Sequence, residues 1–161
     1  MLTVIGSEMN ISHNALEIYL AGCNRGCPDC HNPESHAFGQ GRRWEQWFKV
    51  TAYKIKKNPL IRQVWVMGGD LLCHPEWEAT EFLRTLHTNL HPVQKPIMLW
   101  TGAEEIPDFV LPYVDYVKLG PYLKDRPPHT VSYADLQTGE LYPIILASDN
   151  QTIVNLCDRG M

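Results

Sequence analysis

Short apolar segments alternate with helix-like segments along this chain, and the alternation limits the folds that it can adopt. Residues 43–57 repeat apolar side chains every three or four positions, which is typical of an amphipathic helix, and an apolar face behind Pro75 predicts a second helix. Strands that alternate with helices favour right-handed βαβ units and a parallel sheet. The apolar segments of strand length lie at 15–21, 63–67, 97–100 and 114–119.

The remaining segments add less to this pattern. Pro107 and Pro112 confine a short predicted helix near 104–111, residues 124–143 are polar and rich in turn residues, and 144–147 is a last expected strand. A parallel sheet of this kind is either open or curved. A complete eight-unit barrel needs roughly 250 residues, more than the 161 present. We therefore expect a single α/β domain over residues 1–161, a parallel sheet of βα units curved into a partial, incomplete TIM-like barrel.

Composition excludes several classes of protein. Apolar residues make up 44% and charged residues 20% of the chain, which is ordinary for a soluble globular protein. The net charge of −4 argues against general affinity for nucleic acid. No apolar run reaches the roughly 18 to 20 residues that span a bilayer, and no secretory signal opens the chain. We expect a cytoplasmic protein with neither nucleic-acid nor membrane partners.

Residue types suited to ligand binding follow each of the four predicted strands. A Cys-rich loop follows the first strand, Gly68-Gly69-Asp70 the second, Thr101-Gly102 the third and Gly120-Pro121 the fourth. In parallel α/β sheets and barrels the ligand site lies at the carboxyl ends of the strands. The order of these segments therefore predicts one site built from four loops.

The Cys-rich loop carries the strongest chemical signal. Cys23, Cys27 and Cys30 have the spacing C-x3-C-x2-C, so their thiolates can meet around one metal centre, and Arg25 is expected to help keep them ionised. One interpretation is a structural zinc site completed by His31. The other is an iron–sulfur cluster with three thiolate ligands and one open iron. Cys73 is either a fourth ligand, a redox thiol or a small buried residue, and Cys157 is taken as incidental.

The sequence CNRGCPDCHNPE, residues 23–34, resembles the cluster loop of radical S-adenosylmethionine (SAM) enzymes. The His31-Asn32 pair is similar to that of activases of glycyl-radical enzymes. Gly68-Gly69-Asp70, Leu99-Trp100-Thr101-Gly102 and the segment 148–151 match further motifs of these activases in the same order. The closest similarity is to the activases of anaerobic ribonucleoside-triphosphate reductases. Three segments depart from the family: residues 10–14 replace its Asp-Gly-Pro-Gly-x-Arg, Leu71 replaces a proline, and Lys118-Leu119-Gly120 stands where Val-Asp-Gly is usual.

The resemblance implies a mechanism and its cofactors. Cys23, Cys27 and Cys30 would hold a [4Fe–4S] cluster whose open iron binds SAM. One electron, from a donor such as flavodoxin or ferredoxin, would cleave SAM into methionine and a 5′-deoxyadenosyl radical. That radical would take a hydrogen atom from a glycine of a partner, an anaerobic ribonucleotide reductase or a related glycyl-radical enzyme.

The resemblance also implies which other residues contact SAM. Gly68 and Gly69 would let the backbone approach the ligand, and Asp70 would balance its ammonium group. Asp29 and His31, which flank Cys30, are expected to contact the cofactor, and Thr101 either binds it or caps its strand. Two alternative functions stay open: a radical SAM enzyme acting on a small molecule, such as a deazaguanine synthase, and a non-catalytic zinc-binding module.

Overall fold

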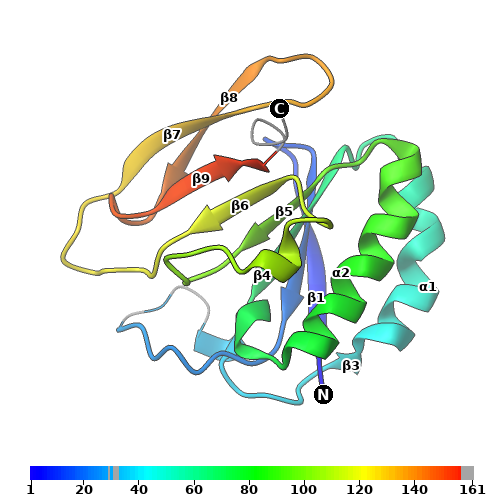
Figure 1. Cartoon of the computed structure of the whole chain (residues 1–161), viewed down its shortest axis with the longest axis horizontal. Helices are drawn as coiled ribbons and strands as arrows, with labels where there is room; N and C mark the ends of the chain where they lie inside the picture. The colour runs from blue at the N-terminus through cyan, green and yellow to red at the C-terminus, as the bar shows by residue number, and fades with distance from the viewer. Residues whose placement is uncertain (29, 31–32, 157–161) are drawn as a thin grey trace.

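The computed structural model describes all residues except 29, 31, 32 and 157–161. Its centre is a seven-stranded mixed sheet in the order β3-β1-β2-β4-β5-β6-β9, and a separate two-stranded sheet pairs β7 with β8. Figure 1 shows two helices side by side on one face of the large sheet and the β7–β8 hairpin arching over its other side. The strands are β1 (Thr3–Asn10), β2 (Ala15–Leu20), β3 (Arg42–Arg43), β4 (Gln63–Gly68), β5 (Ile97–Trp100), β6 (Tyr116–Leu119), β7 (His129–Ala134), β8 (Leu141–Leu146) and β9 (Thr152–Asn155). The α-helices are α1 (Trp44–Lys57) and α2 (Glu76–Leu90), and short 3-10 turns occupy Pro33–Ser35, Leu71–Cys73, His91–Val93 and Asp108–Val110.

The middle of the large sheet is parallel and its margins are antiparallel. β2, β4, β5 and β6 run in the same direction. β1 and β9 pair antiparallel with β2 and β6, and β3 pairs antiparallel with β1. Residues on each strand alternate between the two faces, so each face has its own apolar core.

The two helices cover one face of the sheet. α1 buries Trp44, Trp47 and Phe48 among its inward-facing side chains, and α2 buries Phe82 and Leu83 among others. Each such side chain contributes on the order of 1.5–3 kcal/mol when fully buried. α1 ends at Lys57 with Asn58 as its extended C-cap, since Pro59 lacks the N–H that would continue the helix. At this end, Lys95 Nζ donates hydrogen bonds to two backbone carbonyls, those of Ile55 and Asn58.

The β7–β8 hairpin covers the opposite face. Tyr133 of β7 and Ile144 of β8 pack in one cluster with Trp65, Met98 and Tyr116 of the large sheet. Polar contacts reinforce this packing, because Gln63 Nε2 donates to the Tyr133 hydroxyl over 3.1 Å. The hairpin therefore fills the space that would be the interior of a barrel.

The predicted partial TIM-like barrel is wrong. In the described part of the chain only two strand connections contain an α-helix, β2 to β4 and β4 to β5. The connection from β5 to β6 contains just the 3-10 turn Asp108–Val110, so the short helix predicted near 104–111 is largely absent. The result is a small, mostly β, mixed sheet rather than a helix-rich barrel of repeated βα units.

The individual elements were predicted with mixed success. The strands expected at 15–21, 63–67, 97–100 and 114–119 and the two main helices are confirmed within one or two residues. The segment 124–143, expected to be turns, contains β7 and the start of β8, and no strand was expected at β1, β3 or β9.

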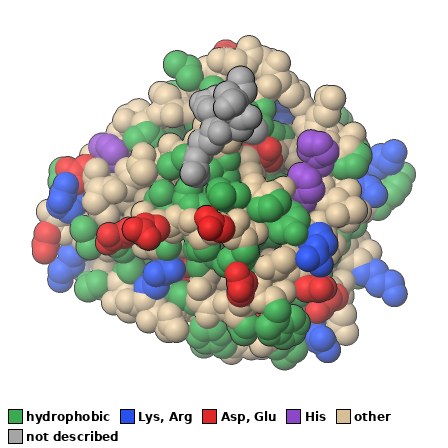
Figure 2. Space-filling model, in the orientation of Figure 1, with side chains coloured by type: hydrophobic (Ala, Val, Ile, Leu, Met, Phe, Trp, Pro, Cys, Tyr) green, Lys and Arg blue, Asp and Glu red, His purple; other side chains and the backbone are tan. Residues whose placement is uncertain are grey.

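The length of the described helices bears on whether one of them spans a membrane, and the charge pattern of the face drawn in Figure 2 on whether it suits nucleic acid. Among the described residues, no helix combines the length and the apolar character that crossing a bilayer requires. Figure 2 shows acidic side chains across the middle of one face, with Lys and Arg mostly toward its margins. This distribution differs from the continuous basic stripe that phosphate-backbone binding favours.

Candidate functional site

The carboxyl ends of the four parallel strands lie at one edge of the sheet. Leu20 of β2 is paired with Gly68 of β4, and Trp100 of β5 with Lys118 of β6. The loops that follow these strands therefore begin side by side, and the predicted convergence of four loops is confirmed.

A cavity of about 600 Å³ opens between these loops. Its volume lies within the range of roughly 300–1,000 Å³ that is common for small-molecule sites. All three cysteines of the C-x3-C-x2-C loop line it, and each is partly exposed. Gly68, Gly69, Asp70, Trp100, Gly102, Lys118, Tyr122, Pro128, Ile145 and Gln151 also contribute to its walls.

Backbone hydrogen bonds hold the start of the cysteine loop in place. The Gly22 N–H donates to the Ser35 carbonyl over 2.7 Å, and the Cys23 N–H to the His36 carbonyl over 3.0 Å. The buried imidazole of His74, for which the sequence suggested no role, lies with Nε2 2.9 Å from the Ala21 carbonyl oxygen. These contacts fasten the start of the cysteine loop, directly after β2, to the segment 35–36 and to His74.

Burial of the Cys23 side chain disfavours its thiolate form. Burial raises its pKa to about 11, although a hydrogen bond from the Arg25 backbone N–H acts in the opposite direction. A side-chain hydrogen bond with Cys73 contributes to the increase, so Cys73 lies beside the first cysteine of the loop. The expectation that Arg25 keeps this thiol ionised is not met for Cys23. Metal binding at Cys23 must therefore release a proton.

The donor set suits a cluster. In the described part of the chain, no three His, Cys, Asp or Glu side chains converge tightly enough to hold one metal ion. In a [4Fe–4S] cluster each thiolate binds a different iron, and three thiols that line one cavity are donors of the kind that holds such a cluster. The predicted contacts of Asp29 and His31, including the zinc alternative with His31, lie outside the described residues, as does Cys157.

Gly68 and Gly69 are tightly enclosed by other backbone atoms. Gly68 has a φ of +91°, a conformation that side chains disfavour. A Cβ atom on Gly69 would lie 2.4 Å from the carbonyl oxygen of Gly22. These glycines thus allow the turn after β4 to pack directly against the cysteine loop, a role in addition to the predicted approach to a ligand.

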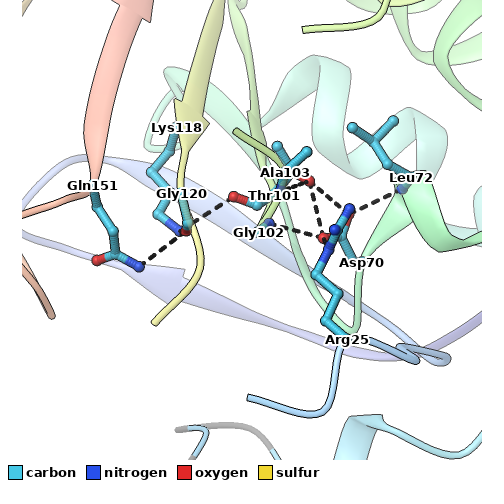
Figure 3. A network of polar contacts seen from close by, with 9 residues as sticks. All are labelled: Arg25, Asp70, Leu72, Thr101, Gly102, Ala103, Lys118, Gly120 and Gln151. Carbon is cyan, nitrogen blue, oxygen red and sulfur yellow. Dashed lines mark hydrogen bonds and ion pairs between the residues drawn. The ribbon is translucent and has the colours of Figure 1, made fainter. Parts of the chain in front are cut away.

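The Asp70 carboxylate is the centre of a buried network (Figure 3). It accepts hydrogen bonds from Arg25 Nε over 2.6 Å and from the Gly102 N–H over 2.8 Å. The Thr101 hydroxyl donates to it over 2.9 Å and the Leu72 N–H over 3.0 Å. Asp70 therefore ties the cysteine loop to the turns after β4 and β5. This geometry makes Asp70 a residue that positions the loop. The predicted role of Asp70 in balancing the ammonium group of SAM stays a prediction.

Thr101 has the contacts of a strand cap. Its hydroxyl donates to Asp70 and accepts a hydrogen bond of 3.1 Å from the Ala103 N–H. The side chain is buried and joins the network behind the cavity.

Two further residues of the cavity wall had no role in the sequence-based prediction. Lys118 is a buried lysine within the otherwise apolar strand β6, and Gln151 precedes β9. Both donate to the carbonyl of Gly120, over 3.0 Å for Lys118 Nζ and 3.3 Å for Gln151 Nε2. Two sequence signals could have indicated this part of the site: a lysine within a buried strand, and the match of the segment 148–151, which contains Gln151, to a motif of the activases.

Comparison with known families agrees with the chemistry of the loop. The profile of a family described as a 4Fe-4S single cluster domain matches residues 14–127 of the 161-residue chain. The chain belongs to this family. The match includes all three cysteines of the loop, the parallel strands and the turns that line the cavity. A comparison with curated proteins finds no match.

Membership of the family makes this an iron–sulfur protein of a type that is consistent with radical SAM chemistry. Cys23, Cys27 and Cys30 are the residues that would hold the cluster.

Proposed function

We propose that this protein is a radical SAM activase that generates a glycyl radical on an anaerobic ribonucleotide reductase or a related glycyl-radical enzyme. The observation that carries the proposal is that the three thiols of the C-x3-C-x2-C loop share one open cavity with the Gly-Gly-Asp turn. When bound, the reduced cluster would supply the electron that splits SAM into methionine and a 5′-deoxyadenosyl radical, which takes a glycine hydrogen atom and becomes 5′-deoxyadenosine.

The residues of the chain would bind, orient and shield the reactants. The Arg25–Asp70 pair holds the cysteine loop against the turns after β4 and β5. Gly68 and Gly69 leave the backbone close to the cavity, where carbonyl groups suit an ammonium group. The wall also includes Trp100 and Met67, whose apolar surfaces exclude water from a radical.

The apolar rim of the cavity is an argument that the substrate is a protein. Ile145 of β8 lines the cavity and is 72% exposed, and Tyr122 and Pro128 also line the cavity. An apolar rim at the mouth of a site favours contact with another protein surface. A flexible glycine-bearing loop of a partner would enter here.

The electron donor would be a flavodoxin or ferredoxin that docks near the cluster. Two groups of basic residues could contact such a donor. Arg42 and Arg43 pair with Val4 and Thr3 at the end of the sheet where β2 ends. The lysines of the last turn of α1 lie at the opposite end, where Lys95 contacts Asn58. Arg42 and Arg43 are thus the better contacts for an acidic donor.

A small-molecule substrate is the second candidate, because the cavity of about 600 Å³ is large enough for one. A deazaguanine synthase is one example of this class.

The test begins with anaerobic reconstitution with iron and sulfide, followed by reduction and addition of SAM. An activase releases methionine and 5′-deoxyadenosine slowly alone and faster with its partner subunit, and the partner develops a glycyl EPR doublet. The Cys27→Ala variant is the matched control and should give neither. If no candidate subunit develops the doublet while a purine-like or pterin-like compound is consumed, the small-molecule function is correct instead.

A further inference from the structure

Lys118 is a buried cation whose charge has no carboxylate partner among the described residues. Its side chain lies on the hairpin face of β6, next to Trp100 on β5, and the residue is 8% exposed. No described Asp or Glu lies within ion-pair distance of Nζ. Burial of this kind disfavours the charged form, and it lowers the pKa of Lys118 to about 8. A lysine kept at such a cost suggests a function for its charge.

The chain fixes the position of this ammonium group. Lys118 Nζ donates to the Gly120 carbonyl over 3.0 Å and lies 3.4 Å from the Thr101 carbonyl oxygen (Figure 3). It also lies 5.8 Å from the centre of the Trp100 ring, where a cation is attracted to the aromatic face. Carbonyl dipoles and an aromatic ring stabilise a cation without cancelling its charge, so the field of Lys118 extends into the cavity.

The cysteines of the loop lie within reach of this field. Lys118, Cys27 and Cys30 line the same cavity. Burial lowers the pKa of Lys118, and negative charge on Asp70 and then on these two cysteines acts in the opposite direction, so all three groups lie within electrostatic range of the ammonium. The Asp70 carboxylate pairs with Arg25 over 2.6 Å. Among the described residues Lys118 forms no ion pair of its own, so its charge can act on an anionic group in the cavity.

We propose that Lys118 compensates the negative charge of the bound cluster, stabilises its one-electron-reduced form and thereby raises its reduction potential. This inference rests on the iron–sulfur part of the proposed function. A [4Fe–4S] cluster with three thiolate ligands is an anion, and it gains one negative charge when an external donor supplies one electron. Nearby charge is among the factors that set cluster potentials. A fixed cation favours the more negative, reduced state over the oxidised one.

The test is a reductive titration of the reconstituted protein, followed by the EPR signal of the reduced cluster. Lys118→Met removes the charge and keeps much of the side-chain length, and Lys118→Gln provides a second neutral variant. In both, the equilibrium constant for reduction should fall at least tenfold, a shift of about 59 mV to lower potential for a one-electron couple. Lys118→Arg keeps the charge and should restore most of the potential.

The control is Lys57→Met, which removes the same charge from an exposed position at the end of α1. Its potential should equal that of the wild type. Unchanged potentials in folded Lys118→Met and Lys118→Gln proteins with full iron content would overturn the inference, because a lysine that only joins β5 to β6 would alter stability alone. Neutral variants that fold but take up no iron would also overturn it. A wild-type protein that assembles no cluster would instead defeat the proposed function.

Discussion

The Arg25 guanidinium of the cysteine loop and the Asp70 carboxylate after β4 form a 2.6 Å ion pair behind the candidate cluster site. The Asp70 side chain is 2% exposed and that of Arg25 is 28% exposed, so water screens the pair only in part. Asp70 also receives hydrogen bonds from the turn after β5. The position of a metal-binding loop is therefore determined by a residue that is itself not expected to bind metal.

Replacement of Asp70 should destabilise the whole site. Asp70→Ala leaves a partly buried guanidinium and several backbone N–H groups without their acceptor, and the loss of one partner of a buried pair costs about 3–5 kcal/mol. Urea unfolding of the cluster-free protein measures this change. Asp149→Ala, which breaks a more exposed pair with Arg126, is the control and should cost about 1 kcal/mol or less. Equal costs for the two variants would contradict the central role of Asp70.

The cysteines should separate into two groups. Cys23→Ala, Cys27→Ala and Cys30→Ala should each abolish the [4Fe–4S] cluster, whereas Cys73→Ala and Cys157→Ala should retain it. Iron content and visible absorption after reconstitution provide the measurement. Cys73→Ala is the strictest test of the three-ligand prediction, because Cys73 forms a hydrogen bond with Cys23. Loss of iron from Cys73→Ala as complete as that from Cys27→Ala would show four protein ligands and no open iron.

Gly69 should be sensitive to a single methyl group. A Cβ there would lie 2.4 Å from the Gly22 carbonyl oxygen, whereas a Cβ on Gly6 of β1 would meet nothing within 4 Å. We expect Gly69→Ala to displace the start of the cysteine loop and to reduce iron uptake severalfold, and Gly6→Ala to leave it unchanged. Full iron uptake by Gly69→Ala would mean that the loop adapts to the added methyl group.

Local patterns predicted the parallel half of the fold. Residues 63–67 and 97–100 are short apolar runs that end at Gly or Thr-Gly, and the spacing of Trp44, Trp47 and Phe48 indicates a helix that covers them. These features depend on neighbours in the sequence, and the structure confirms them. These features gave the order of the parallel strands along the chain and the loops at their carboxyl ends. The proximity of the cysteine loop to Asp70 and Thr101 could therefore also be predicted.

The antiparallel half depends on contacts that are distant in the sequence. β9 pairs with β6, and Tyr133 of β7 packs against Trp65 of β4. β7 carries polar residues at alternate positions because only one of its faces is buried, so the segment resembled a chain of turns. The barrel prediction failed because nothing local indicated that a hairpin would cover the second face of the sheet.

The role of Lys118 was hidden for a related reason. In the sequence, Lys118 is one polar residue in an apolar strand, and only the alignment of β6 with β5 brings it beside Trp100 and the cavity. Sequence motifs indicated the candidate cluster ligands, whereas the electrostatic environment of those residues required the fold.

Lys118 also predicts how the stability of the cluster-free protein depends on pH. Its pKa is 10.5 when unperturbed and falls to about 8 on burial. Between these values the unfolded chain binds the proton and the folded chain does not, so this group makes the folded state more stable as the pH rises. From pH 8 to pH 9 the contribution of Lys118 increases the free energy of unfolding by about 1 kcal/mol. Below pH 8 the folded protein bears the full cost of burying the ammonium group.

The same experiment separates this effect from that of Cys23. The raised pKa of the Cys23 thiol acts in the opposite direction, because above its unperturbed value of 9.0 the unfolded chain loses that proton first. Cys23 is present in both wild type and Lys118→Met, so its contribution cancels in their difference. Urea unfolding at pH 8 and pH 9 should therefore show the wild type gaining about 1 kcal/mol relative to Lys118→Met. Lys57→Met serves as the control for charge removal at the surface. A constant difference between wild type and Lys118→Met would mean that burial does not lower the pKa of Lys118 in the folded protein.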